Sequence, residues 1–281
     1  MSDTAPRRTT NGSPQGGLRL FGKAAFGAGA SRGRVLLVHG YGEHAKRHAE
    51  IASALTAAGF SVWAGDLPGH GEAAGKRGHV RRWEDYLSIV ESWWEALPAA
   101  PAPFFLLGHS VGGLIALDWA GAHPERPRGL LLSSPAFRLG FEPPAWRQAL
   151  ARVVARIWPS FSQPSGIETE GISTVREEVK RYRDDPLCHD RATARFFVSY
   201  LAAAARLRAD TRPLPCPTLV LFGEDDPISS LAAARAWVGA HRDAARLLTF
   251  PEARHELFHE SFVVREAAVQ AVVEFFDSRL R

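Results

Sequence analysis

Cysteine is scarce in this chain of 281 residues, which holds two, Cys188 and Cys216. Their separation matches neither the close pairs of a zinc site nor the dense pattern of a disulfide framework. Long apolar runs are missing as well, because no stretch approaches the roughly 20 residues that a helix needs to cross a bilayer. The sequence therefore predicts that the cysteines pack as small apolar groups and that no segment is inserted in a membrane.

A basic block and an export signal are also missing. The net charge of +4 comes from arginines scattered among acids, which argues against nucleic-acid binding and leaves only a mild attraction to anionic lipid. Residues 1–17 carry no apolar stretch behind their basic pair and are rich in Ser, Thr, Pro and Gly, so we expect them to be disordered. We expect a cytoplasmic protein that at most associates peripherally with membranes and has no obligate protein partner.

What the chain does have is enough apolar material for the core of one large domain, with 46% hydrophobic and 23% charged residues. Short apolar runs alternate with helical patterns along most of its length. Runs such as "FFLL", residues 104–107, are apolar at every position, which is typical of parallel strands covered on both faces. The sequence predicts an α/β fold whose mostly parallel central sheet has helices on both faces.

This alternation lapses between residues 136 and 213, where the pattern indicates helices and loops without a strand. We predict an inserted helical cap over 136–213, with the core formed by 18–135 and 214–281. Five apolar residues of this segment fall on one face of a helix, with the arginines outside it: Trp146, Leu150, Val153, Val154 and Ile157. That face is expected either to pack against the core or to line an apolar entrance for an acyl chain.

A serine lies between two glycines in "GHSVG", residues 108–112, directly after the apolar run and directly before a helical pattern. A serine hydroxyl is a weak nucleophile unless it is exposed, oriented and placed beside a base, and a sharp strand-to-helix turn supplies the exposure. Glycines are needed there because a side chain at either position would crowd the turn. We predict Ser110 as the nucleophile, rather than as part of a merely glycine-rich helix start.

A serine nucleophile needs a base and an orienting acid, which in this architecture follow in the order Ser, Asp, His. The stretch "TLVLFGEDDPIS" places three acids after a predicted strand. We choose Asp226, with Asp225 as the alternative, because Pro227 begins a turn that leaves room to direct the Asp226 carboxylate back across the sheet. His255 follows the last predicted strand by a short loop and is the predicted base.

His255 also begins the letters H-E-x-x-H of a zinc helix, in which Glu256 would be the general base and His259 the second ligand. Both histidines of such a site lie inside the helix, whereas His255 is expected at a loop-to-helix boundary. A metal centre would also leave Ser110 and the acidic loop unexplained. We therefore predict no metal and no organic cofactor.

The stretch "HGYGEH", residues 39–44, follows another predicted strand, and its two glycines permit a tight turn. Such a turn can point a backbone N–H at a reacting carbonyl group. The predicted oxyanion donors are the N–H groups of Tyr41 and Val111. The histidines at positions 44, 70 and 109 are expected to orient loops through hydrogen bonds rather than to transfer protons.

Four stretches together resemble the monoacylglycerol lipase and lysophospholipase family of serine hydrolases with the α/β-hydrolase fold: "HGYGEHAKRH" with the "GHG" that follows it, "FLLGHSVGG", "FGEDDPIS" and "ARHELFHE". The resemblance covers the chain after residue 17 and implies that Ser110, Asp226 and His255 form a catalytic triad. It also implies that Glu43 and Arg47 help to hold the polar end of the substrate, or the loop that does so. A salt bridge near the site is the alternative for this pair.

The resulting prediction is a hydrolase that cleaves carboxylic esters of lipid-like substrates, of the monoacylglycerol or lysophospholipid type, through an acyl-enzyme. The same triad acting on a thioester, amide or carbon–carbon bond is the first alternative. A non-catalytic binding protein and a zinc hydrolase are less favoured. The predicted partner is the small-molecule ester, with transient contact between the cap and a lipid surface.

Overall fold

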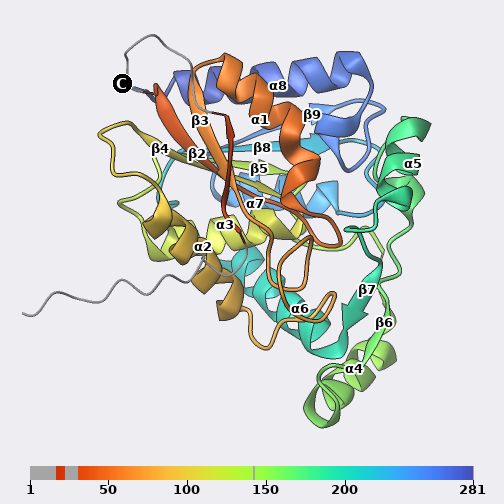
Figure 1. Cartoon of the computed structure of the whole chain (residues 1–281). Helices are drawn as coiled ribbons and strands as arrows, with labels where there is room; N and C mark the ends of the chain where they lie inside the picture. The colour runs from red at the N-terminus through yellow and green to blue at the C-terminus, as the bar shows by residue number, and fades with distance from the viewer. Residues whose placement is uncertain (1–16, 23–30, 142, 281) are drawn as a thin grey trace, which may run out of the picture.

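The computed structural model describes residues 17–22, 31–141 and 143–280, so the disorder expected for residues 1–17 concerns a segment almost wholly outside the described part. A seven-stranded sheet runs through the molecule in the order β1-β3-β2-β4-β5-β8-β9 (Figure 1). Its strands are β1 (Arg19–Gly22), β2 (Gly33–Val38), β3 (Phe60–Ala64), β4 (Phe104–His109), β5 (Gly129–Ser133), β8 (Thr218–Gly223) and β9 (Ala245–Phe250). All neighbours are parallel except β1, which pairs antiparallel with β3. The predicted fold class is confirmed.

The central strands send side chains alternately into two cores. In β2, Leu36 and Val38 belong to one core, and Val35 and Leu37 to the other. Helices cover both faces (Figure 1): α1 (Ala49–Ala57) and α8 (Phe262–Asp277) on one, and α2 (Glu84–Ala96), α3 (Val111–Ala122) and α7 (Leu231–Ala240) on the other. Because neither face of these strands meets water, every position can be apolar. This burial explains the unbroken apolar runs in the sequence.

Helix boundaries follow local capping signals. Thr193 precedes α6 (Ala194–Ala209), and its side-chain oxygen accepts a hydrogen bond from the N–H of Phe196. Ser230 precedes α7 and accepts from the N–H of Ala233 in the same way. Helix α1 is followed by Gly59 at φ +95°, a conformation that glycine adopts without steric cost. These caps fix where the chain leaves each helix and therefore where the loops at the sheet edge begin.

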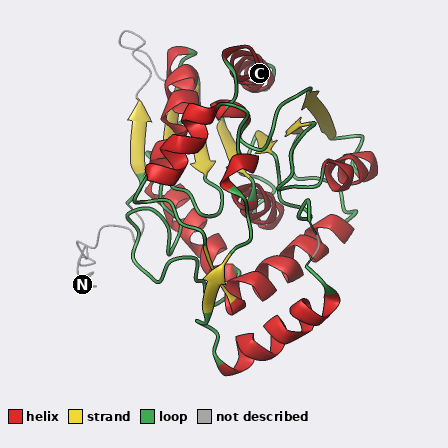
Figure 2. Ribbon diagram, turned by 90° about the vertical axis from the view of Figure 1, so that its right-hand side faces the viewer, coloured by secondary structure: helices red, strands yellow, loops and turns green. Residues whose placement is uncertain are grey.

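Between β5 and β8 the chain forms α4 (Ala145–Ile157), β6 (Ser162–Pro164), η2 (Thr169–Gly171), α5 (Arg176–Asp184), β7 (Arg191–Thr193) and α6 (Ala194–Ala209). Strands β6 and β7 pair antiparallel, so the expectation that this segment lacks strands is wrong. Three residues are too few to show a period in the sequence. Helix α6 packs into one core of the sheet, and α4 lies beside α6 at the edge of the molecule (Figures 1 and 2).

The apolar face of α4 is open to solvent. Exposed fractions are 62% for Trp146, 53% for Leu150 and 80% for Ile157, whereas Ala155 on the opposite side is buried. The expectation that this face packs against the core is therefore wrong. The helical spacing of the apolar residues predicted the two faces of α4, but it carried no information on what lies opposite the apolar face. Among the described residues, no helix combines the length and hydropathy required to cross a membrane.

Helix α3 approaches the sheet closely at its first turn. A Cβ added to Gly112 would lie 2.2 Å from the carbonyl oxygen of His39 and 2.3 Å from that of Val38. A Cβ added to Gly108 would lie 2.5 Å from the carbonyl oxygen of Gly112. Backbone oxygens cannot move aside as a flexible side chain can, so any side chain would push α3 away from the sheet. The crowding expected at these two glycines is confirmed.

We expect Gly112→Ala to lower the free energy of unfolding by about 1–3 kcal/mol or more, because overpacking against fixed backbone is costly. The matched control is Gly121→Ala in the same helix, where an added Cβ would meet nothing within 4 Å. That control should stay neutral or gain up to about 1 kcal/mol, since alanine favours helix over glycine. Urea denaturation of both variants measures the difference, and equal stabilities would contradict the close approach.

Candidate active site

A cavity of about 630 Å³ lies at the carboxyl end of the parallel strands. Its lining comes from loops that follow β2, β4, β8 and β9, and from the segment between β5 and β8. Loops after parallel strands meet at one edge of the sheet, which is where α/β proteins bind ligands. Of the residues predicted from sequence, Ser110, His255, Tyr41, Val111 and Glu43 all line this cavity.

Ser110 occupies the turn between β4 and α3 in a strained backbone conformation, with φ +53° and ψ −120°. Three hydrogen bonds hold it: its N–H donates to the carbonyl of Ser133 at 2.9 Å, and its own carbonyl accepts from Gly113 and Ala136. A non-glycine residue in this region costs on the order of 1–3 kcal/mol, so the surroundings must enforce it. The residue is 7% exposed, and that exposure faces a cavity which its side chain lines.

His255 and Asp226 are directly hydrogen-bonded, with 2.8 Å between Nδ1 and Oδ2. The Asp226 side chain is fully buried, and its other oxygen accepts from the N–H groups of Ile228 and Ser229. Asp225, the alternative acid, is exposed. Burial lowers the pKa of His255, but the Asp226 carboxylate raises it more, so the pKa lies above its ordinary value of 6.5. The pair has the chemistry of an oriented general base.

The loop that carries Asp226 is also paired with the first residues after β5. Gly140 N–H donates to the carbonyl of Ile228 at 2.8 Å, and Ser230 N–H donates to the carbonyl of Arg138 at 2.9 Å. Leu139 and Ser229 form an antiparallel bridge between them. The acid loop is therefore held from both sides, by its own turn and by the start of the inserted segment.

The loop after β2 passes directly beside Ser110. A Cβ added to Gly40 would lie 3.2 Å from the Cβ of Ser110, and the Gly40 N–H donates to the Glu43 carboxylate at 2.6 Å. Gly42 has φ +81°, so a side chain there would be strained. Val111 is the first residue of α3, where a backbone N–H has no partner within the helix. The cavity thus has both Tyr41 and Val111 at the same end as the serine.

A group of buried charges lies next to His255, and the sequence predicted only part of it. Glu43 accepts from His48 at 3.0 Å and lies 3.5 Å from Arg47, whose guanidinium also pairs with Glu256. His259 contacts Glu256 at 3.1 Å. All five side chains are at most 8% exposed. Glu43 and Arg47 are therefore parts of an ion network, and Arg47 is not among the residues that line the cavity.

The network keeps its carboxylates ionised. Burial raises the pKa of Glu256, but Arg47 and His259 lower it more, and the resulting pKa is about 2. Burial lowers the pKa of His259, and Glu256 raises it above the ordinary value. The sequence did not predict that Glu256 and His259 belong to this network, because Arg47 lies 209 positions from Glu256 and 212 from His259.

The zinc-helix interpretation does not fit this geometry. His255 lies in a loop, and His259 ends η3 (Leu257–His259), a single turn of 3-10 helix. Their nitrogens are engaged separately, His255 Nδ1 with Asp226 and His259 Nε2 with the carbonyl of Arg47. An H-E-x-x-H site requires both histidines on one face of an α-helix.

Comparison with known proteins agrees with this geometry. The model of the family described as serine aminopeptidase, S33 (Hydrolase_4) matches residues 29–261. A monoacylglycerol lipase of Mycolicibacterium smegmatis is 30% identical over 235 residues, which cover 82% of this chain and 83% of that protein. The phospholipase YtpA of Bacillus subtilis is 28% identical over 249 residues, 86% of this chain and 94% of the relative.

Solved structures extend the likeness to three dimensions. The crystal structure of a monoacylglycerol lipase from Paleococcus ferrophilus matches with a TM-score of 0.84 at 34% identity, covering 93% of this chain and 98% of that one. A TM-score this high at 34% identity means that the two chains share one fold. The chain therefore belongs to the Hydrolase_4 family of serine hydrolases with the α/β-hydrolase fold, alongside monoacylglycerol lipases and phospholipases.

Proposed function

We propose that the chain hydrolyses carboxylic esters of the monoacylglycerol or lysophospholipid type, with Ser110 as nucleophile, His255 as general base and Asp226 as orienting acid. The observation that carries this proposal is the hydrogen-bonded Asp226–His255 pair at the wall of a cavity that Ser110 also lines. The relatives named as monoacylglycerol lipases and as a phospholipase support the substrate class.

The cavity suits a substrate with a long apolar part and one polar end. Apolar residues form much of its wall, among them Leu139, Phe141, Leu150, Val154, Phe161 and Phe197. Charged and hydrogen-bonding groups gather at the end near Ser110, where Glu43, His255 and Glu256 lie. An acyl chain can lie along the apolar wall while the ester carbonyl sits at the serine, which is how a few polar groups orient an apolar ligand.

In the first half of the reaction, the Ser110 oxygen attacks the ester carbonyl carbon while His255 Nε2 takes the hydroxyl proton. Asp226 accepts the Nδ1 proton in a hydrogen bond, which fixes the tautomer and stabilises the imidazolium that forms. The carbonyl oxygen becomes an oxyanion, and the N–H groups of Tyr41 and Val111 stabilise it. Collapse of this intermediate releases the alcohol with the proton from His255 and leaves Ser110 acylated.

In the second half, His255 takes a proton from water as the water oxygen attacks the acyl carbon. The same N–H groups stabilise the second oxyanion, and collapse returns the proton to Ser110 and releases the carboxylic acid. Every proton transferred passes through one imidazole. The chain's own side chains and backbone supply each of these groups.

Glu43 and Arg47 support the loop that presents Tyr41. Glu43 holds the Gly40 N–H at 2.6 Å, immediately before Tyr41, and Arg47 links Glu43 to Glu256 beside the base. We assign these residues as positioning residues rather than as contacts of the substrate. Removing either would leave a buried charge without its partner, which is destabilising.

Residues 136–213 are the proposed cap over this cavity, and α4 is its proposed contact with lipid. Trp146, Leu150 and Val154 line the cavity from the apolar side of the helix, and Ile157 is exposed beyond it. The exposed arginines of α4 lie outside the apolar arc, at positions 147, 152 and 156. An apolar face bordered by cations is the pattern of helices that lie on anionic membranes. Substrate would then pass from the lipid surface into the cavity along one continuous apolar path.

We expect long-chain monoacylglycerols and lysophosphatidylcholines to be hydrolysed faster than acyl amides of the same chain length. Ser110→Ala should reduce the rate by about 10⁶, as loss of a serine nucleophile does elsewhere, and should abolish labelling by a fluorophosphonate probe. Ser88→Ala, at an exposed position on α2, is the control and should change neither. Unaltered hydrolysis by Ser110→Ala would refute the proposal.

The activity should fall on the acid side, because His255 must be neutral to accept a proton. Its pKa is raised above 6.5, so kcat/KM for a neutral ester should drop about tenfold per pH unit below that apparent pKa. Asp226→Asn should move this limb to lower pH, since burial alone lowers the pKa, and should reduce the plateau by about 10⁴. A flat pH profile between about pH 5 and 8 would contradict this assignment of the base.

Ile157→Glu should slow hydrolysis of an ester embedded in anionic vesicles by about tenfold or more, because burying an isoleucine contributes about 1.5–3 kcal/mol. Hydrolysis of a water-soluble short-chain ester should not change. Val263→Glu is the matched control: Val263 is 76% exposed, compared with 80% for Ile157, but lies on α8, at the far side of the molecule from α4 (Figure 1). Equal rates of ester hydrolysis in vesicles for the two variants would contradict the proposed contact of α4 with lipid.

A further inference from the structure

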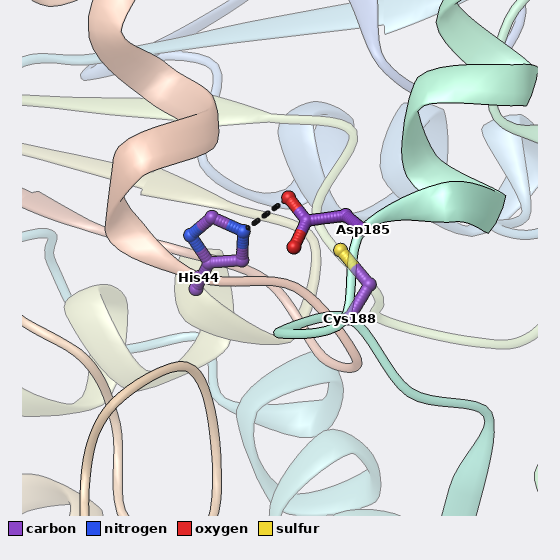
Figure 3. Close-up of side chains that lie close together, drawn as sticks. All are labelled: His44, Asp185 and Cys188. Carbon is purple, nitrogen blue, oxygen red and sulfur yellow. Dashed lines mark hydrogen bonds and ion pairs between the residues drawn. The ribbon is translucent and has the colours of Figure 1, made fainter.

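Three potential metal ligands from two distant parts of the chain converge outside the cavity. His44 immediately precedes η1 (Ala45–His48), whereas Asp185 and Cys188 follow α5 (Figure 3). Their ligand atoms, Nε2, a carboxylate oxygen and Sγ, all lie within 4.8 Å of one another. The imidazole edge and the sulfur both face the carboxylate in Figure 3. None of the three residues lines the active-site cavity.

Backbone hydrogen bonds already hold Asp185 and Cys188 in this arrangement. The carbonyl of Asp185 accepts the N–H of Cys188 at 3.1 Å, so a turn brings the two side chains together. One oxygen of Asp185 accepts the N–H of Leu187 at 2.8 Å, and the other meets His44 Nε2 at 2.9 Å. The carboxylate is thus fixed in orientation and already directed at the imidazole.

Burial and charge also favour a cation at this point. His44 is 3% exposed and Asp185 is 26% exposed, so the cluster is shielded but can be reached from solvent. Burial raises the pKa of Asp185, but the hydrogen bond from His44 lowers it more, which keeps the carboxylate ionised. The nearby guanidinium of Arg47 is already paired with Glu256 and Glu43.

The tautomer of His44 is not fixed by its other nitrogen. Nδ1 is buried and has no hydrogen-bond partner among the described residues. The proton on Nε2 can therefore move to Nδ1, which leaves the Nε2 lone pair free for a ligand. Within the described part of the chain, no hydrogen bond at Nδ1 has to be broken for this change.

We propose that His44, Asp185 and Cys188 bind one thiophilic divalent cation, for which Zn²⁺ is the best fit. One nitrogen, one oxygen and one sulfur ligand suit Zn²⁺, whereas Mg²⁺ and Ca²⁺ select oxygen alone. Zinc distances of about 2.0–2.3 Å place tetrahedral ligands about 3.5 Å apart, so the three atoms need shifts of roughly an ångström. Water completes the fourth position.

Each metal ion that binds releases one proton from the protein. The Cys188 thiol gives its proton to solvent and becomes a thiolate ligand, and the imidazole keeps its single proton on Nδ1. Burial raises the pKa of the Cys188 thiol well above its ordinary value, and thiol deprotonation must precede coordination. Metal affinity therefore rises about tenfold per pH unit while the thiol stays protonated in the free protein.

The bound ion would fasten the loop of residues 40–44 to the chain after α5. These two parts already meet through the His189 N–H, which donates to the carbonyl of Gly42 at 2.8 Å, and through the Tyr41 hydroxyl, which donates to the carbonyl of Arg191 at 2.7 Å. A ligand that binds only the folded arrangement stabilises it. The site is structural, and it stands or falls independently of the proposed ester hydrolysis.

The test is a Co²⁺ titration of the full chain after treatment with a chelator, because Co²⁺ bound to a thiolate shows charge-transfer absorption. We expect saturation at one ion per chain and displacement by Zn²⁺. Cys188→Ser and Asp185→Asn should lose at least about 100-fold in affinity, because even a change in a residue that only holds a ligand in place costs about 10-fold or more. Cys216→Ser is the matched control, because that second free cysteine lies elsewhere in the core, and it should behave as the wild type.

Thermal unfolding provides a second measurement that does not depend on activity. Zn²⁺ should raise the midpoint of the wild type and of Cys216→Ser but not that of Cys188→Ser, and the effect should grow with pH. All three proteins should unfold in a single cooperative transition in chelator, which shows that each is folded. Absence of the charge-transfer band in the wild type up to about pH 9, or its retention in Cys188→Ser, would overturn the proposal.

Discussion

The close contact between α3 and the sheet is the constraint on which the rest of the site depends. Gly112 lies against the backbone of β2 with no room for a side chain, and this contact sets where α3 begins. Ser110, two residues before Gly112, must then turn the chain at positive φ. The strain is balanced by three backbone hydrogen bonds and by the burial of the strands on either side. If Ser110 is the nucleophile that we propose, it loses little conformational freedom when the substrate arrives.

Electrostatics around the base depend on several carboxylates with different partners. Asp226 is bound to His255, while Glu43 and Glu256 are neutralised by Arg47 and its neighbours. The ring of His109 lies near that of His255, with centroids 4.9 Å apart and planes tilted by 57°, and burial lowers the pKa of His109 to about 3. It therefore stays neutral wherever His255 titrates. Of these two neighbouring imidazoles, only that of the proposed base changes its charge in the pH range where the base works.

The sequence predicted the fold class and the residues around the cavity because these leave local signals. Unbroken apolar runs indicate strands that are buried on both faces. A serine between glycines at the end of such a run indicates a strand-to-helix turn. Contacts between distant residues leave no comparable pattern. The pair Arg47–Glu256 is separated by 209 positions, and His44–Asp185 by 141. The exposure of the apolar face of α4 was not predicted for the same reason, since an amphipathic pattern describes one helix and not its neighbours.

The pairing of residues 138–140 with residues 228–230 has a consequence for how the protein can move. The loop that follows Asp226, the proposed orienting acid, is joined to the start of the segment between β5 and β8 by one small antiparallel contact. A displacement of α4 that began beyond Gly140 would leave this contact, and with it the Asp226–His255 hydrogen bond, in place.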